Sequence, residues 1–454
     1  YTGKGVKIVV LDTGIDYTHA DLGGPGTQEA FEKAKASDTI PEGTYDPKKF
    51  LGGYDLVGDD YNSGKKETST PHPDNNPLDC GGHGSHVAGT AAGYGVNADG
   101  STFHGDYSKL TEEQLKDMKI GPGSAPDAQL IGLRIFGCKG TTAFVPKGLD
   151  RVLDPNDDGD FSDRADIANL SLGNEFGVFD ETVNYAVGSL YREGILSVVA
   201  AGNANNYNAV GDTYSNSGGP GTSAYGLTVA NSIGSTQLVD RVKILSPANE
   251  ADTYGDYSVS FDYSKATEEQ LRGTVVRAAS RNRYACEAFT EEEAAALKGK
   301  WALIDWADAD GSAPCGSKVR FDNLQAAGAT GVVLTSNTEV GDTAIGGNSS
   351  IPGMRLAKSQ VERLSAQIDS GELTLQLGEN LRDSIRVPNG KLDQANTSTA
   401  RGMHGSHGIT KPDVAAPGTN ISSIEVGSGT GSSVKTGTSM STPFVAGVAA
   451  LIMQ

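Results

Sequence analysis

Ser439 is the side chain of this sequence best suited to act as a nucleophile. It stands in the turn Gly437-Thr438-Ser439-Met440-Ser441-Thr442-Pro443, which opens a small and apolar stretch. No charge occurs between 436 and 453, so we expect a buried helix that is covered on all sides. Unpaired N–H groups and the positive end of the dipole at its start favour negative charge on oxygen. A serine at this position can also be a plain helix cap.

An acid and an imidazole stand at similar junctions elsewhere in the chain. Asp12 ends the β-branched run 5–12, which predicts a buried parallel strand whose carboxyl end is a usual place for active-site residues. It could equally be a simple turn residue. His83 begins a stretch of small residues that predicts a second helix, with His86 packed beneath it. No His-Glu-x-x-His pattern is present, so the two histidines do not indicate a metal.

Strands and helices alternate through the first half of the chain. We expect strands at 5–12, 125–136, 167–173 and 195–201, and helices at 30–36, 81–93, 142–153 and 179–193. The segments 23–79 and 97–124 are polar and rich in turn residues, and we expect surface loops there. This alternation predicts an α/β fold with a parallel sheet and helices on both faces. Asn203 follows the last strand and is either a turn former or a side-chain amide donor.

The motifs around these residues closely resemble those of the subtilase family of serine peptidases. Its three signatures match Val10-Leu11-Asp12-Thr13-Gly14, His83-Gly84-Ser85-His86-Val87-Ala88-Gly89-Thr90 and Gly437-Thr438-Ser439-Met440-Ser441-Thr442-Pro443. The segments Asn169-Leu170-Ser171-Leu172-Gly173 and Ala201-Gly202-Asn203 are also similar. Ser85 stands where most members have Thr. The resemblance covers about residues 1–235 and 396–454, and the order acid, histidine, serine is the one known for subtilisin.

The resemblance implies a role for each of these side chains. Ser439 would attack the scissile carbonyl, His83 would take and return its proton, and Asp12 would orient His83 and stabilise its cation. The amide of Asn203 and the N–H of Ser439 would stabilise the oxyanion.

It also implies where a peptide substrate would bind. The segments expected to line the cleft are Ser171, Leu172 and Gly173 on one side and Gly137 and Lys139 on the other, with Gly218 at the wall of the S1 pocket. The run Gly218-Gly219-Pro220-Gly221 offers neither an acid nor a base. We therefore expect broad specificity with an apolar P1 residue.

Charge and length exclude several other classes of partner. The 454 residues carry a formal net charge of −20. Nucleic acids and anionic membranes reward basic surfaces, so we expect neither as a partner. No apolar run reaches transmembrane length. We expect protein or peptide substrates and an extracellular location, either secreted or associated with the cell surface.

The ends of the chain suggest processing. There is no initiator Met and no signal peptide at Tyr1. By resemblance to the family, we expect an N-terminal propeptide that is removed, and a C-terminal truncation at Gln454.

Between 236 and 395 the alternation of the catalytic domain stops. This region resembles a protease-associated (PA) domain, with a core at about 284–385, inserted between a first catalytic part at 1–235 and a second at 396–454. Within it we expect strands at 298–306 and 328–335 and helices at 319–327 and 359–370. Its role could be substrate gating, protein binding or packing.

The chain has four cysteines. Pairing of Cys80 with Cys138 and of Cys286 with Cys315 is the arrangement we favour, although three connectivities are formally possible and four free thiols are the alternative. A Cys80–Cys138 bond would tie the loop before His83 to the substrate-binding edge and would indicate an oxidising compartment. No cysteine or histidine cluster indicates zinc.

One acidic loop is a candidate calcium site. Oxygen ligands recur in the segment 154–166 at Asp154, Asn156, Asp158 and Asp160, with Gly159 at the sixth position. Ala165 occupies the position of the closing glutamate, so Asp163 or Asp166 would have to supply that carboxylate. Similar loops in some subtilases bind structural Ca²⁺. The alternative is a solvated acidic loop without an ion.

These observations together predict a secreted subtilisin-like serine endopeptidase that acts through an acyl-enzyme. One alternative is a catalytically inactive protein of the same fold that serves in binding or adhesion. An esterase is disfavoured because the residues around Ser439 lack the Gly-x-Ser-x-Gly elbow.

Overall fold

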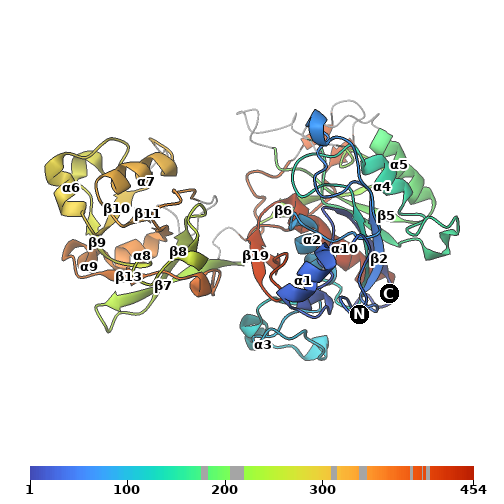
Figure 1. Cartoon of the computed structure of the whole chain (residues 1–454), viewed down its shortest axis with the longest axis horizontal. Helices are drawn as coiled ribbons and strands as arrows, with labels where there is room; N and C mark the ends of the chain where they lie inside the picture. The colour runs from blue at the N-terminus through green and yellow to red at the C-terminus, as the bar shows by residue number, and fades with distance from the viewer. Residues whose placement is uncertain are drawn as a thin grey trace. The chain divides into compact units, whose positions relative to one another are not determined.

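A computed structural model of the chain describes two compact units. The described residues are 1–174, 182–204, 219–307, 314–336, 345–388, 392–400, 402–404 and 409–454. The first unit comprises Tyr1–Gly234 and Lys391–Gln454, and the second comprises Ser235–Gly390. Figure 1 labels their elements.

The first unit is built on a parallel sheet of seven strands. In the order β17-β6-β5-β4-β1-β3-β2, every neighbouring pair is parallel. The strands are β1 (Lys7–Asp12), β2 (Phe50–Asp55), β3 (Gln129–Arg134), β4 (Ile167–Leu170), β5 (Leu196–Ala200), β6 (Leu227–Ser232) and β17 (Val414–Pro417). The carboxyl ends of β1, β4 and β5 therefore lie along one edge, which is where ligands bind in open α/β sheets.

Helices cover both faces of this sheet. The α-helices described in this unit are α1 (Gln28–Lys35), α2 (His83–Ala92), α3 (Glu112–Asp117), α4 (Val145–Asp150), α5 (Thr182–Arg192) and α10 (Thr438–Met453), of which α3 is exposed and buries no residue. In β1, Ile8 and Val10 join one apolar cluster with residues of α2 and α10, whereas Val9 and Leu11 join a second with residues of α4 and α5. Helices α4 and α5 lie side by side in Figure 1. Alternate side chains of β1 thus pack into two apolar cores, one on each face of the sheet. The predicted parallel sheet with helices on both faces is confirmed.

Two small hairpins complete the unit. One pairs β15 (Gly402–His404) with β16 (Ile409–Lys411), and the other pairs β18 (Ile421–Ile424) with β19 (Ser432–Lys435). Helix α2 packs against β18.

Three expectations for this unit were wrong. The segment 23–79 is not all surface loop, because it contributes the edge strand β2 with the buried Phe50. The two glycines of β2 made this strand difficult to recognise, because glycine is uncommon in strands. The fold requires glycine at Gly53, where a Cβ would lie 1.8 Å from the carbonyl oxygen of Gly132 in β3. The segment 97–124 contains the short helix α3, which is held by a capping box at Thr111. Helix α10 is not covered on all sides, because Phe444, Ile452 and Met453 are exposed.

The second unit is a small β-barrel with four α-helices among its described residues. The strands are β7 (Thr236–Ser246), β8 (Thr253–Tyr257), β9 (Arg272–Arg277), β10 (Trp301–Asp305), β11 (Gly331–Thr335), β12 (Gly353–Leu356), β13 (Thr374–Gln376) and β14 (Ile385–Pro388). The helices are α6 (Glu291–Leu297), α7 (Ser317–Ala326), α8 (Lys358–Arg363) and α9 (Ser365–Asp369). Pairing of β13 with β7 closes seven strands into a ring, and β14 adds to β7 outside it.

This barrel is consistent with the expected PA-like domain. The predicted elements β10, α7 and β11 are confirmed. The single helix expected over 359–370 is instead two, α8 and α9, since the backbone leaves the helical region at the fully buried Leu364.

Candidate active site

The carboxylate of Asp12 holds the imidazole of His83. Asp12 ends β1 with 1 % of its surface exposed, and both of its oxygens accept from the Nδ1 of His83, at 2.8 and 2.9 Å. His83 is the first residue of α2. The close approach of α2 to β1 requires a glycine at Gly84, where a Cβ would lie 2.1 Å from the carbonyl oxygen of Gly14. With Nδ1–H directed at Asp12, the Nε2 of His83 is the nitrogen left to accept a proton.

Asp79 fixes the turn that carries His83. It is fully buried, and one of its oxygens accepts from the N–H groups of Gly81 and Gly82, at 2.8 and 2.9 Å. The other accepts from the backbone and the hydroxyl of Ser85, at 2.9 and 2.6 Å. The carboxylate therefore supplies acceptors that the start of α2 would otherwise lack. Sequence reasoning missed this residue, although an acid just before a helix is a recognised capping signal.

The pKa of His83 is raised above its ordinary value. Burial alone would lower the pKa, because it disfavours the cation. The charge of Asp12 and the hydrogen bond to it outweigh burial, with a further contribution from the charge of Asp79. His86, three residues on, is buried as expected, and its Nε2 lies 2.9 Å from the carbonyl oxygen of Ile421.

Ser439 is the second residue of α10 and is half-buried. Its hydroxyl donates to the backbone carbonyl of Ser171 at 3.2 Å, and the Ser171 hydroxyl donates to the carbonyl of Ser439 at 2.8 Å. Asn169 donates to that same Ser171 hydroxyl at 3.0 Å. Since α10 packs against α2, Ser439 and His83 begin neighbouring helices at one edge of the sheet.

Asn203 lies just past β5 with its amide oriented by Thr438. The Oδ1 of Asn203 accepts from the backbone N–H of Thr438 at 2.9 Å and from its hydroxyl at 3.3 Å. The Thr438 hydroxyl in turn accepts from the N–H of Gly202 at 3.1 Å. An N–H can bond only to the amide oxygen, so this arrangement fixes Nδ2 as the donor available to a ligand. No sequence motif indicated this role for Thr438.

The expected substrate-binding segments differ in exposure. Ser171 is buried, Leu172 is half-buried and Gly173 is exposed, so this segment emerges at the surface where another strand could pair with it. Gly137 is buried against the carbonyl oxygen of Tyr61, which a Cβ would approach to 2.3 Å, and Lys139 is exposed. Gly218 lies outside the described residues.

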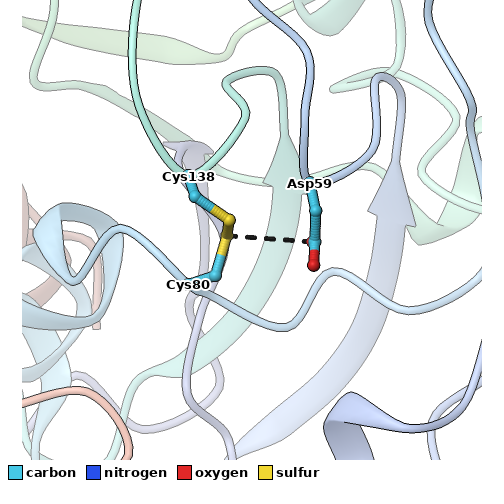
Figure 2. Close-up of side chains that lie close together, drawn as sticks. All are labelled: Asp59, Cys80 and Cys138. Atoms are coloured by element: carbon cyan, nitrogen blue, oxygen red, sulfur yellow. Dashed lines mark hydrogen bonds between the residues drawn. A yellow bond between two sulfur atoms is a disulfide. The ribbon is translucent and has the colours of Figure 1, made fainter.

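The two disulfides join Cys80 to Cys138 and Cys286 to Cys315, which is the pairing we favoured. The first links the turn before His83 to the segment after β3 (Figure 2).

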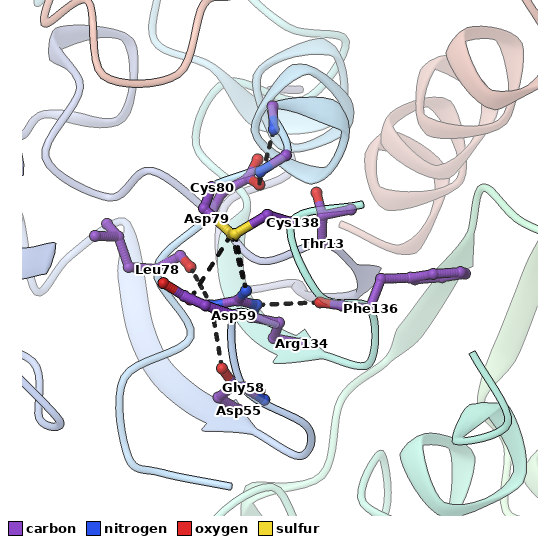
Figure 3. The surroundings of a disulfide bond; sticks show 12 residues. Thr13, Asp55, Gly58, Asp59, Leu78, Asp79, Cys80, Arg134, Phe136 and Cys138 are labelled. Atoms are coloured by element: carbon purple, nitrogen blue, oxygen red, sulfur yellow. Dashed lines mark hydrogen bonds and ion pairs between the residues drawn. A yellow bond between two sulfur atoms is a disulfide. The ribbon is translucent and has the colours of Figure 1, made fainter. Parts of the chain in front are cut away.

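The Arg134 side chain lies against this first disulfide (Figure 3). Only 2 % of the residue is exposed, and its guanidinium contacts the carboxylates of Asp55 and Asp59 at 3.1 and 2.7 Å. It also donates to the carbonyls of Leu78 and Phe136, both at 3.1 Å. Burial raises the pKa of Asp55, and the charge of Arg134 opposes that shift. No sequence motif indicated this cluster.

The acidic loop is mostly exposed, and backbone groups occupy several of its oxygens. Asp154 accepts from the N–H groups of Asp158 and Gly159 at 3.0 and 2.9 Å, and Asp166 accepts from the N–H of Lys7 in β1 at 2.8 Å. Asp163 differs, because its Oδ1 is buried without a hydrogen-bond partner in the described part of the chain. Burial raises the pKa of Asp163, and the charges of Asp158 and Asp154 raise it further.

In this conformation the carboxylates of the acidic loop do not converge on one point. Among the described residues, three carboxylate, imidazole or sulfur ligand atoms converge within 4.8 Å only at Asp59, Cys80 and Cys138. Two of those three are bonded to each other.

The model of the subtilase family, Peptidase S8, matches residues 3–454. The chain belongs to this family. It is 30% identical over 461 residues to the minor extracellular protease Vpr of Bacillus subtilis (strain 168), covering 100% of this chain and 46% of that protein. It is 27% identical over 489 residues to the PI-type proteinase of Lactococcus lactis subsp. cremoris, covering 100% of this chain and 23% of that one.

The chain thus spans less than half the length of these curated relatives. A solved structure described as a cold adapted subtilisin-like serine proteinase covers 100% of this chain and 77% of its own, with 18% identity and a TM-score of 0.39. Among the described helices, we found none with the length and apolar character to cross a lipid bilayer.

Proposed function

We propose that this protein is an endopeptidase in which Ser439, His83 and Asp12 act as the catalytic triad. The observation that carries the proposal is the paired contact between the Asp12 carboxylate and the Nδ1 of His83. It leaves Nε2 of His83 as the nitrogen that can act as the base. Family membership supports the same assignment.

In this mechanism the Ser439 hydroxyl turns from the Ser171 carbonyl toward His83 and attacks the scissile carbonyl. His83 accepts its proton and delivers it to the leaving amine, which leaves an acyl-enzyme that water hydrolyses by the reverse proton path. The carboxylate of Asp12 stabilises the imidazolium through its contacts with Nδ1. The Nδ2 of Asn203 and the N–H of Ser439 at the start of α10 donate to the oxyanion.

The substrates are proteins or peptides that bind as an extended strand beside Ser171, Leu172 and Gly173. The exposure of Gly173 and the half-burial of Leu172 support this placement. An apolar P1 residue and broad specificity remain our proposal for the pocket near Gly219–Gly221. We further propose that the protein acts outside the cell, which the two disulfides and the extracellular Bacillus relative support.

Labelling with a fluorophosphonate probe tests the triad. We expect the probe to modify Ser439 and no other serine, and the Ser439→Ala variant to remain unlabelled. A folded protein that takes up no probe would refute the proposal and favour an inactive binding protein with the same fold. Turnover of a chromogenic peptide would then also be absent.

We also propose that the acidic loop binds a structural calcium ion. Asp154, Asn156, Asp158, Asp160 and Asp163 supply hard oxygen ligands, and the unpartnered buried oxygen of Asp163 fits a cation. Neutralising these mutually repelling carboxylates would stabilise the native state. A chelator should lower the melting temperature of the Ser439→Ala protein, and Asp158→Ala should remove that response. Equal melting with and without chelator would exclude the site.

A further inference from the structure

An acid-lined cavity of about 400 Å³ reaches the disulfide beside the catalytic turn. Cys80 lines it together with Arg134, whereas Cys138 is not part of its wall. Its acidic side chains are Asp38, Asp59, Asp60, Asp74 and Asp79, and its Lys and Arg side chains are Lys35 and Arg134. A small molecule that entered this cavity would therefore meet Cys80 first, in a negative environment.

The two sulfurs lie at different distances from the buried cation. The Nη2 of Arg134 is 2.9 Å from the Sγ of Cys80 and 3.8 Å from the Sγ of Cys138. The exposed carboxylate of Asp59 lies 3.8 Å from the Sγ of Cys80 (Figure 2). Because a guanidinium stabilises a nearby thiolate, either sulfur can leave as an anion here. Access from the cavity then selects Cys80 as the sulfur that is attacked.

We propose that Cys80–Cys138 is a thiol–disulfide exchange site that takes a small, positively charged thiol. The incoming thiolate attacks the Sγ of Cys80, the Cys80–Cys138 bond breaks, and its electron pair stays on Cys138 as a thiolate beside Arg134. The new disulfide joins Cys80 to the small thiol, which is oxidised while Cys138 is reduced. The adduct occupies the cavity.

The charge of the cavity determines the class of thiol. Five carboxylates against two cations repel a thiolate that carries a second negative charge. A thiol with an ammonium group is neutral overall when its sulfur is ionised, and its cation can approach Asp59 and Asp60. Because carboxylates outnumber cations in the cavity lining, we expect the thiol with an ammonium group to react faster than a thiol of similar size that carries a second negative charge. The expected difference is about tenfold at low salt.

The exchange would act on the catalytic turn. Cys80 follows Asp79, whose carboxylate accepts hydrogen bonds from the turn, and it precedes His83 by three residues. Breaking its bond to Cys138 frees this turn from the segment after β3. We expect kcat to fall when the adduct forms, and this consequence rests on the proposed peptidase function. The chemistry at Cys80 does not depend on it.

The chemistry is tested in the Ser439→Ala protein, in which autolysis is absent. Cysteamine and 2-mercaptoethanesulfonate are compared at equal thiolate concentration, with their rates on hydroxyethyl disulfide as the reference. After quenching with N-ethylmaleimide, peptide mapping should find the cysteamine adduct on Cys80 and the alkyl group on Cys138. The reverse assignment, or equal corrected rates for the two thiols, would overturn the proposal.

Two matched variants separate charge from access. Asp59→Asn should lower the preference for cysteamine about threefold, because it removes a negative charge 3.8 Å from the Sγ of Cys80. Asp117→Asn, an exposed acid in α3 that does not line the cavity, should leave the preference unchanged. If Asp59→Asn behaves like Asp117→Asn, the electrostatic argument is wrong.

Activity is followed separately in the active protein. Fluorophosphonate labelling before treatment establishes whether the peptidase proposal holds. An adduct on Cys80 with unchanged kcat would overturn only the link to His83, whereas loss of activity that cysteamine removal reverses would support it.

Discussion

Lowering the pH should destabilise the first unit through His86. This imidazole is fully buried, and its Nε2 donates to the carbonyl of Ile421 at 2.9 Å. Its Nδ1 is buried with no hydrogen-bond partner in the described part of the chain. Burial lowers the pKa of His86 from 6.5 to about 3, with smaller contributions from the charges of Lys435 and His83. His86 is therefore protonated at a lower pH in the folded protein than in the unfolded chain.

The direction and magnitude of this change in unfolding free energy follow from the linkage between protonation and folding. A histidine with a lowered pKa in the folded state contributes stability fully above its unfolded pKa, and this contribution is lost as the pH falls below 6.5 toward 3. At about pH 4.5 the loss should be about 2–3 kcal/mol. Buried carboxylates act in the opposite direction, because burial raises the pKa of Asp16 to about 6 and of Asp21 to about 7. The total pH dependence is therefore not diagnostic, and a comparison with a His86 variant is required.

The assay is urea unfolding of the Ser439→Ala protein with and without His86→Gln, at about pH 7 and about pH 4.5. Glutamine keeps a donor for Ile421 but does not titrate. Circular dichroism follows both units, and tryptophan fluorescence follows the second, since the chain has two tryptophans and these are Trp301 and Trp306. The protein with His86 should lose about 2–3 kcal/mol more than the variant on acidification. Equal losses in the two proteins would refute the argument.

Three further predictions concern catalysis and the insert. Asn203→Ala should lower kcat by about 10²–10³-fold with little change in KM, measured with a chromogenic peptide, since it removes one oxyanion donor; an unchanged kcat would contradict this role. The acid limb of kcat/KM should have its midpoint above 6.5, because Asp12 raises the pKa of His83 more than burial lowers it, and a pH–rate profile with a lower midpoint would show the opposite balance. Replacing Cys286 and Cys315 by Ser should destabilise the second unit by about 3–4 kcal/mol for the loop that they close, measured by tryptophan fluorescence; no change in the urea midpoint would argue against the bond.

The architecture of the first unit was largely predictable because its signals are local. The β-branched run of β1 is buried on both faces, and such runs indicate parallel strands without knowledge of their neighbours. The strand β2 escaped detection because its glycines serve a close contact with Gly132 that only the folded sheet creates.

The barrel was harder to predict because its closure is not local. It depends on pairing of β13 with β7, whose residues lie more than a hundred positions apart, and β13 contributes only Thr374–Gln376. A strand of three residues carries almost no periodicity, so its role is decided by its partners. Helices α8 and α9 are likewise separated by a tertiary contact, because the buried Leu364 ends a helix that the sequence pattern would continue.

The candidate active site also contains residues that the sequence predicts and supporting contacts that only the folded structure shows. Asp12, His83, Asn203 and Ser439 stand at junctions of strands, turns and helices, and those junctions can be read from the sequence. The groups that hold them in place depend on contacts across the fold: Thr438 aligns Asn203 through its own backbone N–H. A threonine at the first position of a helix does not identify the acceptor of its N–H, so this contact could not have been predicted.

Asp79 shows why the support of a site can matter as much as its reacting groups. Its buried carboxylate would be costly without partners, and four donors from one turn satisfy it. The same charge contributes to the raised pKa of His83. Cys80 follows it directly and is bonded to Cys138, so a covalent bond and a saturated carboxylate hold one short turn. In the proposed mechanism His83 must keep its position through two proton transfers, so this double restraint lies where that mechanism is most sensitive to displacement.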